Sequence, residues 1–285
     1  MGFTSVVIVG APRSGTNMLR DALTQFSGWS TWPCDEINYI WRHGNVRFPS
    51  DEFSEDMARA GVQGYIGRRF EWVARRYRAD VVVEKTCANS LRLGFVDRVI
   101  PGARYVFIRR DGLDAVGSAI HRWRAAADPR YLLRKARFVP ATDLPYYAVR
   151  YIWNRGYRVA SRRQRLAFWG PQLTGMGDLL QSHSLEEVCA LQWKRCVDRS
   201  AEALAAMPRE RWVEVGYENL VRAPRTELER IVDTLGLSAA DVDLDRASKG
   251  ISPASVGKGR SQLGASWVDR LEPLIGDTLC RYGYG

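Results

Sequence analysis

A short buried strand that leads directly into a glycine-containing turn constrains this chain most. Residues 6–9 read Val-Val-Ile-Val, residues 10–15 read Gly-Ala-Pro-Arg-Ser-Gly, and a helical pattern begins near Thr16. A continuous β-branched run is typical of a strand that is buried on both faces of a parallel sheet. The free N–H groups and the dipole at the start of the helix favour a bound phosphate. The pattern therefore predicts an α/β fold with a phosphate-binding loop.

The same turn differs from the loop of nucleoside triphosphatases. Gly10 and Gly15 have the spacing of that loop, but Thr16 stands at its lysine position and Asn17 at the position of its magnesium-binding hydroxyl. The cation lies within the turn instead, as Arg13. We therefore expect a loop that binds phosphate but does not handle a metal-bound γ-phosphate. The alternative is an ordinary β-α turn without a ligand.

Strand and helix patterns alternate along most of the chain. Further strands are expected at 81–84, 104–108 and 212–215, and helices at 16–26, 54–78, 89–100, 111–124, 184–206, 224–235 and 267–281. Residues 29–38 and 249–264 are expected to be irregular. This alternation favours a central parallel sheet with helices on both faces, in a three-layer sandwich like that of the P-loop nucleoside triphosphatases. No linker or repeat divides the chain, so residues 1–285 are expected to form a single domain.

The alternation fails between about residues 128 and 177. This stretch is rich in Arg, Tyr and Trp and contains four prolines, with one helical pattern at 146–163. Long segments of this kind inside a compact domain are usually functional. We expect an insertion over the mouth of the sheet, above an acceptor site. A solvated surface decoration is the alternative.

Composition limits the kinds of ligand, metal site and cellular location that we expect for this chain. The net charge of +10 implies an anionic ligand or surface, yet no nucleic-acid-binding motif is present, so we expect no nucleic-acid partner. Five scattered cysteines without a Cys-x-x-Cys pair, and three histidines without ligand spacing, predict free thiols and no zinc site. No run is apolar enough to span a membrane and no signal peptide precedes residues 6–9, which predicts a cytoplasmic protein.

Two further groups of polar residues follow predicted strands. Arg110 ends the 104–108 strand pattern, and Ser118 lies two helical turns further on, so together they could clamp a second phosphate. Lys85 ends the 81–84 strand, where burial of an ammonium group requires an anion. The alternatives are a surface ion pair between Arg110 and Asp114, and a pair between Glu84 and Lys85.

These motifs resemble those of the sulfotransferases that use 3′-phosphoadenosine 5′-phosphosulfate (PAPS). The resemblance is to the bacterial type of that family. Residues 12–16 (Pro-Arg-Ser-Gly-Thr) are similar to the 5′-phosphosulfate loop of that family. Arg110, Asp114 and Ser118 match its 3′-phosphate motif, Arg-x-x-x-Asp-x-x-x-Ser.

Two later segments extend the resemblance in the order of the family. Residues 215–220 (Val-Gly-Tyr-Glu-Asn-Leu) resemble its Tyr-Glu-Asp/Asn-Leu segment, and residues 258–260 (Lys-Gly-Arg) resemble its C-terminal basic-glycine turn. The four motifs extend from residue 6 to about residue 267.

The resemblance implies roles for particular residues. The residues implied to hold the 5′-phosphosulfate are Pro12, Arg13, Ser14, Gly15, Thr16 and Asn17. Those implied to hold or cover the 3′-phosphate are Arg110, Ser118, Lys258, Gly259 and Arg260. Tyr217 is implied to contact the adenine, and Lys85 to lie near the transferring sulfuryl group.

The chain departs from the family at two positions. Many members carry a histidine base two residues after the lysine, where this chain has Cys87, and a tryptophan that stacks on adenine where this chain has Met18. We expect Glu36 to be the base, because aromatic surroundings should raise the pKa of its carboxyl group. Asp35 and His121 are rival bases, and Glu36 could instead be a solvated loop acid.

The function implied is transfer of a sulfuryl group from PAPS to an acceptor hydroxyl, with adenosine 3′,5′-bisphosphate (PAP) as product and no metal ion. Glu36, Lys85 and Arg13 are the expected catalytic residues. Aromatic residues mixed with arginines in the 128–177 segment mildly favour a glycan or glycolipid acceptor. The alternatives are an ATP-dependent small-molecule kinase and a non-enzymatic polyanion-binding protein. The oligomeric state is left open.

Overall fold

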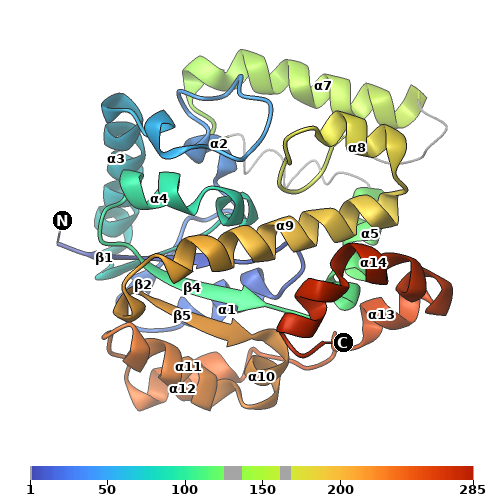
Figure 1. Ribbon diagram of the computed structural model, residues 1–285. Coiled ribbons are helices and arrows are strands. Elements are labelled where there is room, and N and C mark those ends of the chain that lie inside the picture. Colours follow the sequence, from blue (N-terminus) through green and yellow to red (C-terminus); the bar gives the residue numbers. More distant parts are fainter. Residues whose placement is uncertain (1, 125–136, 161–167, 285) are drawn as a thin grey trace.

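A five-stranded parallel sheet forms the centre of the computed structural model, which describes residues 2–124, 137–160 and 168–284 (Figure 1). The strand order is β2-β3-β1-β4-β5. The strands are β1 (Thr4–Val9), β2 (Trp29–Ser30), β3 (Val81–Lys85), β4 (Arg104–Arg109) and β5 (Trp212–Gly216). All four pairings are parallel, so the carboxyl ends of the strands share one edge of the sheet.

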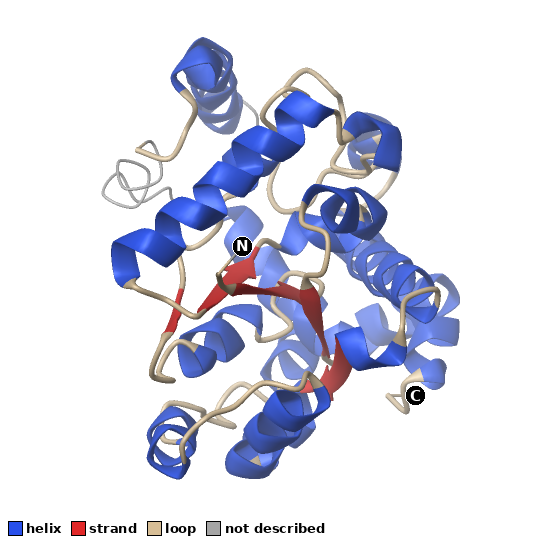
Figure 2. Cartoon of the chain, turned by 90° about the vertical axis from the view of Figure 1, so that its left-hand side faces the viewer, coloured by secondary structure: helices blue, strands red, loops and turns tan. Residues whose placement is uncertain are grey.

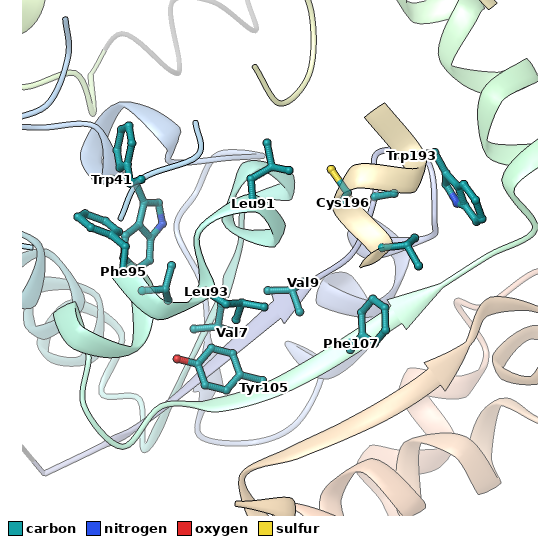
Figure 3. Close-up of a cluster of buried hydrophobic side chains, with 14 of the residues drawn as sticks. Val7, Val9, Trp41, Leu91, Leu93, Phe95, Tyr105, Phe107, Trp193 and Cys196 are labelled. Carbon is teal, nitrogen blue, oxygen red and sulfur yellow. The ribbon is translucent and has the colours of Figure 1, made fainter. Parts of the chain in front are cut away.

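The two faces of the sheet are buried in separate apolar clusters. In β1, Val6 and Ile8 contribute to one cluster, while Val7 and Val9 contribute to the other. This division follows from the two-residue period of a strand, whose successive side chains point to opposite faces. Figure 3 shows the second cluster, where strand residues meet side chains from the neighbouring helices, among them Trp193. Burial on both faces accounts for the continuous β-branched runs in the sequence.

Helices cover both faces of the sheet (Figure 2). The cluster that contains Val6 includes residues of α1 (Thr16–Leu23), α10 (Tyr217–Arg222), α11 (Pro224–Thr234) and α12 (Asp241–Ser248). The cluster that contains Val7 includes residues of α3 (Ala60–Tyr77), α4 (Leu93–Val99), α5 (Gly112–Arg124), α9 (Leu185–Ala205) and α14 (Ala265–Arg281). The predicted three-layer α/β sandwich is therefore confirmed.

Eight further helical elements are described. They are α2 (Asn38–Trp41), η1 (Glu55–Met57), η2 (Cys87–Leu91), η3 (Ala141–Asp143), α7 (Leu144–Ala160), α8 (Met176–Ser182), η4 (Arg209–Arg211) and α13 (Lys258–Leu263). Within the described parts of the chain, no helix combines the length and the apolar character that crossing a membrane requires.

The structure differs from the sequence-based expectations at several boundaries. The helix expected at 54–78 is divided into η1 and α3, and the one expected at 89–100 begins as the 3-10 turn η2. The segment 29–38 contains the edge strand β2, and the loop expected at 249–264 contains the helix α13. Parts of the segment 128–177, which is expected to be an insertion, lie outside the described residues, namely residues 128–136 and 161–167.

Candidate active site

Three strands deliver polar loops to the same edge of the sheet. The loop after β1 holds residues 10–15, β3 ends at Lys85, and the chain after β4 leads through Arg110 into α5. Because β1 lies between β3 and β4, these three loops are neighbours. Ligands of open parallel sheets bind at this edge, outside the carboxyl ends of the strands. The sequence-predicted phosphate and catalytic residues thus gather at one place.

The loop after β1 has the backbone of an anion-binding turn. Arg13 and Gly15 both have positive φ, 70° and 87°, and Gly15 caps the start of α1. A left-handed conformation is unusual for an arginine and is retained at sites that bind ligands. Ser14 is fully buried, and its hydroxyl has no hydrogen-bond partner among the described residues. An orphaned hydroxyl beside a helix N-terminus fits a bound phosphate or sulfate group.

Tyr217 connects this loop to the second predicted phosphate site. A Cβ atom at Gly15 would overlap the ring of Tyr217, so the loop and the ring are in direct contact. The guanidinium carbon of Arg110 lies 4.4 Å from the centre of the same ring. Tyr217 therefore lies between the two predicted phosphate-binding elements.

Arg13 and Arg110 directly connect the two predicted phosphate-binding elements. The Nε of Arg13 donates to the Oγ of Ser118 at 2.8 Å, and the Nη1 of Arg110 donates to the carbonyl oxygen of Arg13 at 3.1 Å. Burial, and then the nearby positive charges of Arg122 and Arg110, lower the pKa of Arg13 below its usual value. Crowded guanidinium groups of this kind are stabilised when an anion binds between them.

Asp114 connects Arg110 to residues 257–260, at the start of α13. Its carboxylate accepts hydrogen bonds from the Nη2 of Arg110 at 3.0 Å and from the backbone N–H groups of Gly257 at 2.6 Å and Arg260 at 3.0 Å. The pair of Arg110 and Asp114 is almost fully buried rather than a surface pair. A Cβ at Gly259 would overlap the carbonyl oxygen of Asp114, so only glycine permits this approach of α13 to α5.

The predicted turn at 258–260 is the first turn of α13, and its side chains diverge. Lys258 is exposed, while the guanidinium of Arg260 lies 3.5 Å from a carboxylate oxygen of Asp111 and donates to the carbonyl of Tyr284 at 3.2 Å. The backbone of the segment therefore contacts Asp114 beside Arg110. In this structure the side chain of Arg260 is directed toward the C-terminal residues.

Lys85 forms the centre of an ion cluster with the two candidate carboxylates. Its Nζ is 3.0 Å from Glu36 Oε1 and 3.2 Å from Asp35 Oδ1, and its side chain is only 2% exposed. Burial alone would lower the pKa of Lys85, but the Glu36 carboxylate and other neighbours raise it above its usual value. Lys85 is therefore a fixed positive charge at physiological pH. In turn its ammonium group pairs with the carboxylate of Glu36.

Asp35 and Glu36 have different surroundings. Asp35 also accepts from Arg20 of α1, at 2.9 Å through its backbone carbonyl and 3.2 Å through its carboxylate. Glu36 accepts instead from the backbone N–H of Cys87 at 3.3 Å. The Cys87 sulfur lies 3.7 Å from the hydroxyl of Thr16. Cys87 therefore contacts both Glu36 and the first residue of α1, and it connects Glu36 to the predicted phosphate loop. Arg20 was not anticipated from the sequence, because nothing local connects it to Asp35.

The thiol that replaces the family's histidine is unsuited to proton abstraction. Burial, followed by the Glu36 carboxylate, raises the pKa of Cys87 to about 12, so the thiol stays neutral at physiological pH. His121 is exposed on α5, one turn beyond Ser118. Of the expected bases, Glu36 and Asp35 are the two that the structure brings to Lys85.

A buried polar network connects the end of β3 to the segment that carries Glu36. Glu84, which is fully buried, accepts from the hydroxyl of Thr86 at 2.5 Å and from the side-chain amide of Asn89 at 2.9 Å. The Thr86 hydroxyl also accepts from the backbone N–H of Ile37, the residue after Glu36, at 3.3 Å. Burial raises the pKa of Glu84 to about 7. The segment that carries Glu36 is therefore fixed to β3 through a titratable group.

We expect this network to make stability depend on pH. Burial raises the pKa of the Glu84 carboxyl group from its ordinary value of 4.5 to about 7 in the folded chain. Between these two values the folded chain therefore binds more protons than the unfolded chain. The free energy of unfolding consequently falls as the pH rises through 7. Relative to Glu84→Gln, the wild type should lose up to roughly 3 kcal/mol of unfolding free energy from pH 4.5 to pH 8. Urea unfolding of both proteins at several pH values measures this difference, and a difference independent of pH would contradict the assignment.

The described parts of the 128–177 segment contact the site from two sides. The rings of Tyr147, on α7, and Tyr39, on α2, are 4.7 Å apart, and a Cβ at Gly170 would lie 3.7 Å from Pro12 of the phosphate loop. The predicted position of the insertion over an acceptor site stays a prediction. No group of three or more His, Cys, Asp or Glu side chains in the described part of the chain is placed to hold a metal ion.

Comparison with known proteins gives an independent result. The model of the sulfotransferase family matches residues 5–164 and 154–241. Among solved structures, the chain is similar to sulfotransferase STF9 from Mycobacterium avium, with a TM-score of 0.55 and 15% identity over 99% of this chain and 77% of that one. It is also similar to the sulfotransferase domain of the curacin biosynthetic pathway, with a TM-score of 0.54 and 12% identity over 96% and 98%. No curated protein sequence matches the chain. At these identities the solved structures support the fold alone.

Proposed function

Because the chain belongs to the sulfotransferase family, we propose that it transfers a sulfuryl group from PAPS to a hydroxyl group of an acceptor. The observation that carries the proposal is the direct connection of two anion-binding elements. Arg13 of the phosphate loop bonds Ser118 and lies against Arg110, which is held by Asp114. A donor with phosphate groups at both its 3′ and 5′ positions matches two such elements around one tyrosine ring.

The residues present fit such a donor. Three hydrogen-bond donors are available for anionic oxygens. They are the hydroxyl of Ser14, the buried Nε–H of Arg110, which has no described partner, and the backbone N–H groups at the helix N-terminus that begins at Thr16. In our proposal residues 12–17 hold the 5′-phosphosulfate, and Arg110 and Ser118 hold the 3′-phosphate. The backbone of Gly259, Lys258 and Arg260 closes that second site, and Tyr217 contacts the nucleoside.

The proposed reaction is an in-line transfer assisted by a carboxylate base. Bound PAPS supplies an activated sulfur atom with PAP as the leaving group. Glu36 removes the proton from the acceptor hydroxyl, whose oxygen forms the new bond to sulfur while the bond from sulfur to the 5′-phosphate oxygen breaks. Lys85, Arg13 and the N–H groups of the loop stabilise the negative charge on the leaving phosphate and the sulfuryl oxygens. No residue role in this scheme requires a metal ion.

The acceptor is proposed to be a glycan or a glycolipid. Support comes from the described aromatic residues of α7 and the following segment, which are mixed with arginines. Tyr146, Tyr147 and Phe168 are within contact distance of other rings or of the Arg150 guanidinium. Faces of this kind suit sugar rings, because aromatic carbon covers the ring while charged donors reach the hydroxyl groups.

Calorimetric titration with PAP tests the donor assignment. We expect micromolar binding that requires the 3′-phosphate, so that adenosine 5′-monophosphate binds much more weakly, and that is unaffected by EDTA. Arg110→Ala should remove most of the preference for PAP, since the 3′-phosphate loses its guanidinium. Lys258→Ala should weaken PAP binding less.

The same titration separates the alternatives. Preference for magnesium-ATP over PAP would contradict the proposal and indicate a kinase on this scaffold. Equal, strongly salt-dependent binding of PAP and unrelated polyanions would indicate a non-enzymatic polyanion-binding protein.

A further inference from the structure

One helix presents an apolar face to solvent. α7 lies along an edge of the molecule (Figure 1). Positions three and four residues apart share one face of a helix. The outer face of α7, as we define it, consists of Leu144, Pro145, Ala148, Val149, Ile152 and Trp153, all exposed. Val149, Ile152 and Trp153 are 69%, 69% and 68% exposed. Over residues 144–153 this face carries no charged residue.

The opposite face of α7 is fixed to the protein. Tyr147 packs edge to face on Tyr39, and Asp143, just before the helix, bonds His43 at 2.8 Å. These contacts attach α7 to α2 and the turn after it. The helix therefore cannot turn its outer face inward without breaking them, and the apolar surface is a fixed feature of this side of the molecule.

Positive charge is concentrated in the sequence around this helix. Residues 122–165 contain twelve Arg and Lys residues against two Asp, a net charge of +10 that equals the net charge of the whole chain. Arg122 and Arg137, near the start of this stretch, are exposed. A helix face that is apolar over residues 144–153 and lies within a strongly basic segment matches the two components of an anionic bilayer surface, its acyl boundary and its negative headgroups.

We propose that α7 docks the protein on an anionic lipid bilayer, with its outer face inserted at the level of the headgroups. Trp153 suits this position, because an indole ring prefers the boundary between apolar and aqueous layers. A nucleic acid would offer no partner for the aliphatic side chains at 149 and 152. Since α7 packs on α2, close to Glu36 in the chain, docking would bring the proposed acceptor side toward lipid; this last consequence depends on the proposed function.

Vesicle co-sedimentation of the full chain tests the proposal. The probe is a set of vesicles of phosphatidylcholine with or without 30% phosphatidylglycerol, in low and high salt. We expect binding to the anionic vesicles, at least about tenfold weaker binding to neutral ones or in high salt, and at least about tenfold weaker binding for Val149→Ser combined with Trp153→Ser. Val242→Ser is the matched control, because Val242 is also 67% exposed but lies on α12.

The outcomes decide the proposal independently of enzyme activity. Retained PAP binding and circular dichroism in the double variant show that it is folded, so its loss of vesicle binding supports docking through α7. Absence of wild-type binding to anionic vesicles overturns the proposal, as does binding that the double variant retains. Light scattering covers one further outcome. If the wild type is a dimer that does not bind vesicles, and the double variant is a monomer, the outer face of α7 is an interface between two copies of this chain and the proposal is overturned.

Discussion

Replacing Glu36 with glutamine is expected to lower turnover by about 10²–10⁴-fold, the range that a general base supplies, while PAP affinity stays nearly unchanged. The substitution keeps the size of the side chain and its acceptor oxygen toward Lys85 and the Cys87 N–H. It removes only the capacity to take a proton. The measurement is the rate of PAP release from PAPS with an acceptor identified by a screen with labelled donor.

Asp35→Asn is the matched control for this experiment. Asp35 lies 3.2 Å from the same ammonium group, yet it is also held by Arg20, which suits a structural role. We expect this variant to lose much less activity than Glu36→Gln. Undiminished turnover in Glu36→Gln would exclude Glu36 as the base, and a larger loss in Asp35→Asn would transfer the role to Asp35.

The parts of the fold that the sequence predicted correctly are those with local signals. The buried strands β1, β3, β4 and β5 appear as β-branched runs, and the start of α9 appears as a capping box in which Ser184 and Glu187 bond each other. The order of these signals was enough to predict a parallel sheet with helices on both faces. The family match is consistent with that prediction.

The helix α13 shows why the rest could not be predicted. Residues 249–264 are rich in glycine and serine, which favours a loop. The start of the helix is stabilised by the carboxylate of Asp114, which lies more than 140 residues earlier. It accepts from the backbone N–H groups of Gly257, the residue before α13, and of Arg260. Such a cap exists only in the folded chain, so a local pattern cannot indicate it.

The site has the same division. Residues 10–16 could be predicted to form a phosphate-binding loop because turn, cation and helix start are contiguous. The contacts among Lys85, Glu36 and Asp35 span about 50 residues, and the sequence supplied the candidates but not their distances. The sequence also did not indicate that the ammonium group of Lys85 lies 3.0 Å from Glu36.

Replacing Lys85 with alanine is expected to lower turnover by about 10²–10³-fold, the typical cost of removing one preorganised charge that stabilises a transition state. Lys85 is buried, protonated and immobilised by two carboxylates, so it can meet developing negative charge without reorganising. Because the phosphate groups of PAP are proposed to bind Arg13, Arg110 and Ser118, PAP affinity should change little. Turnover and calorimetry on the same preparation separate the two effects.

A purely structural pairing of Lys85 with Glu36 gives different results. In that case Lys85→Ala would lower thermal stability, and the activity per folded molecule would be retained. If the two residues act together on one transition state, the double variant Lys85→Ala with Glu36→Gln should lose little more activity than the more damaged single variant. Lys85→Arg, which keeps the charge but not its compact position, should recover only part of the rate. Multiplicative losses in the double variant would show instead that the base and the cation contribute independently to the rate.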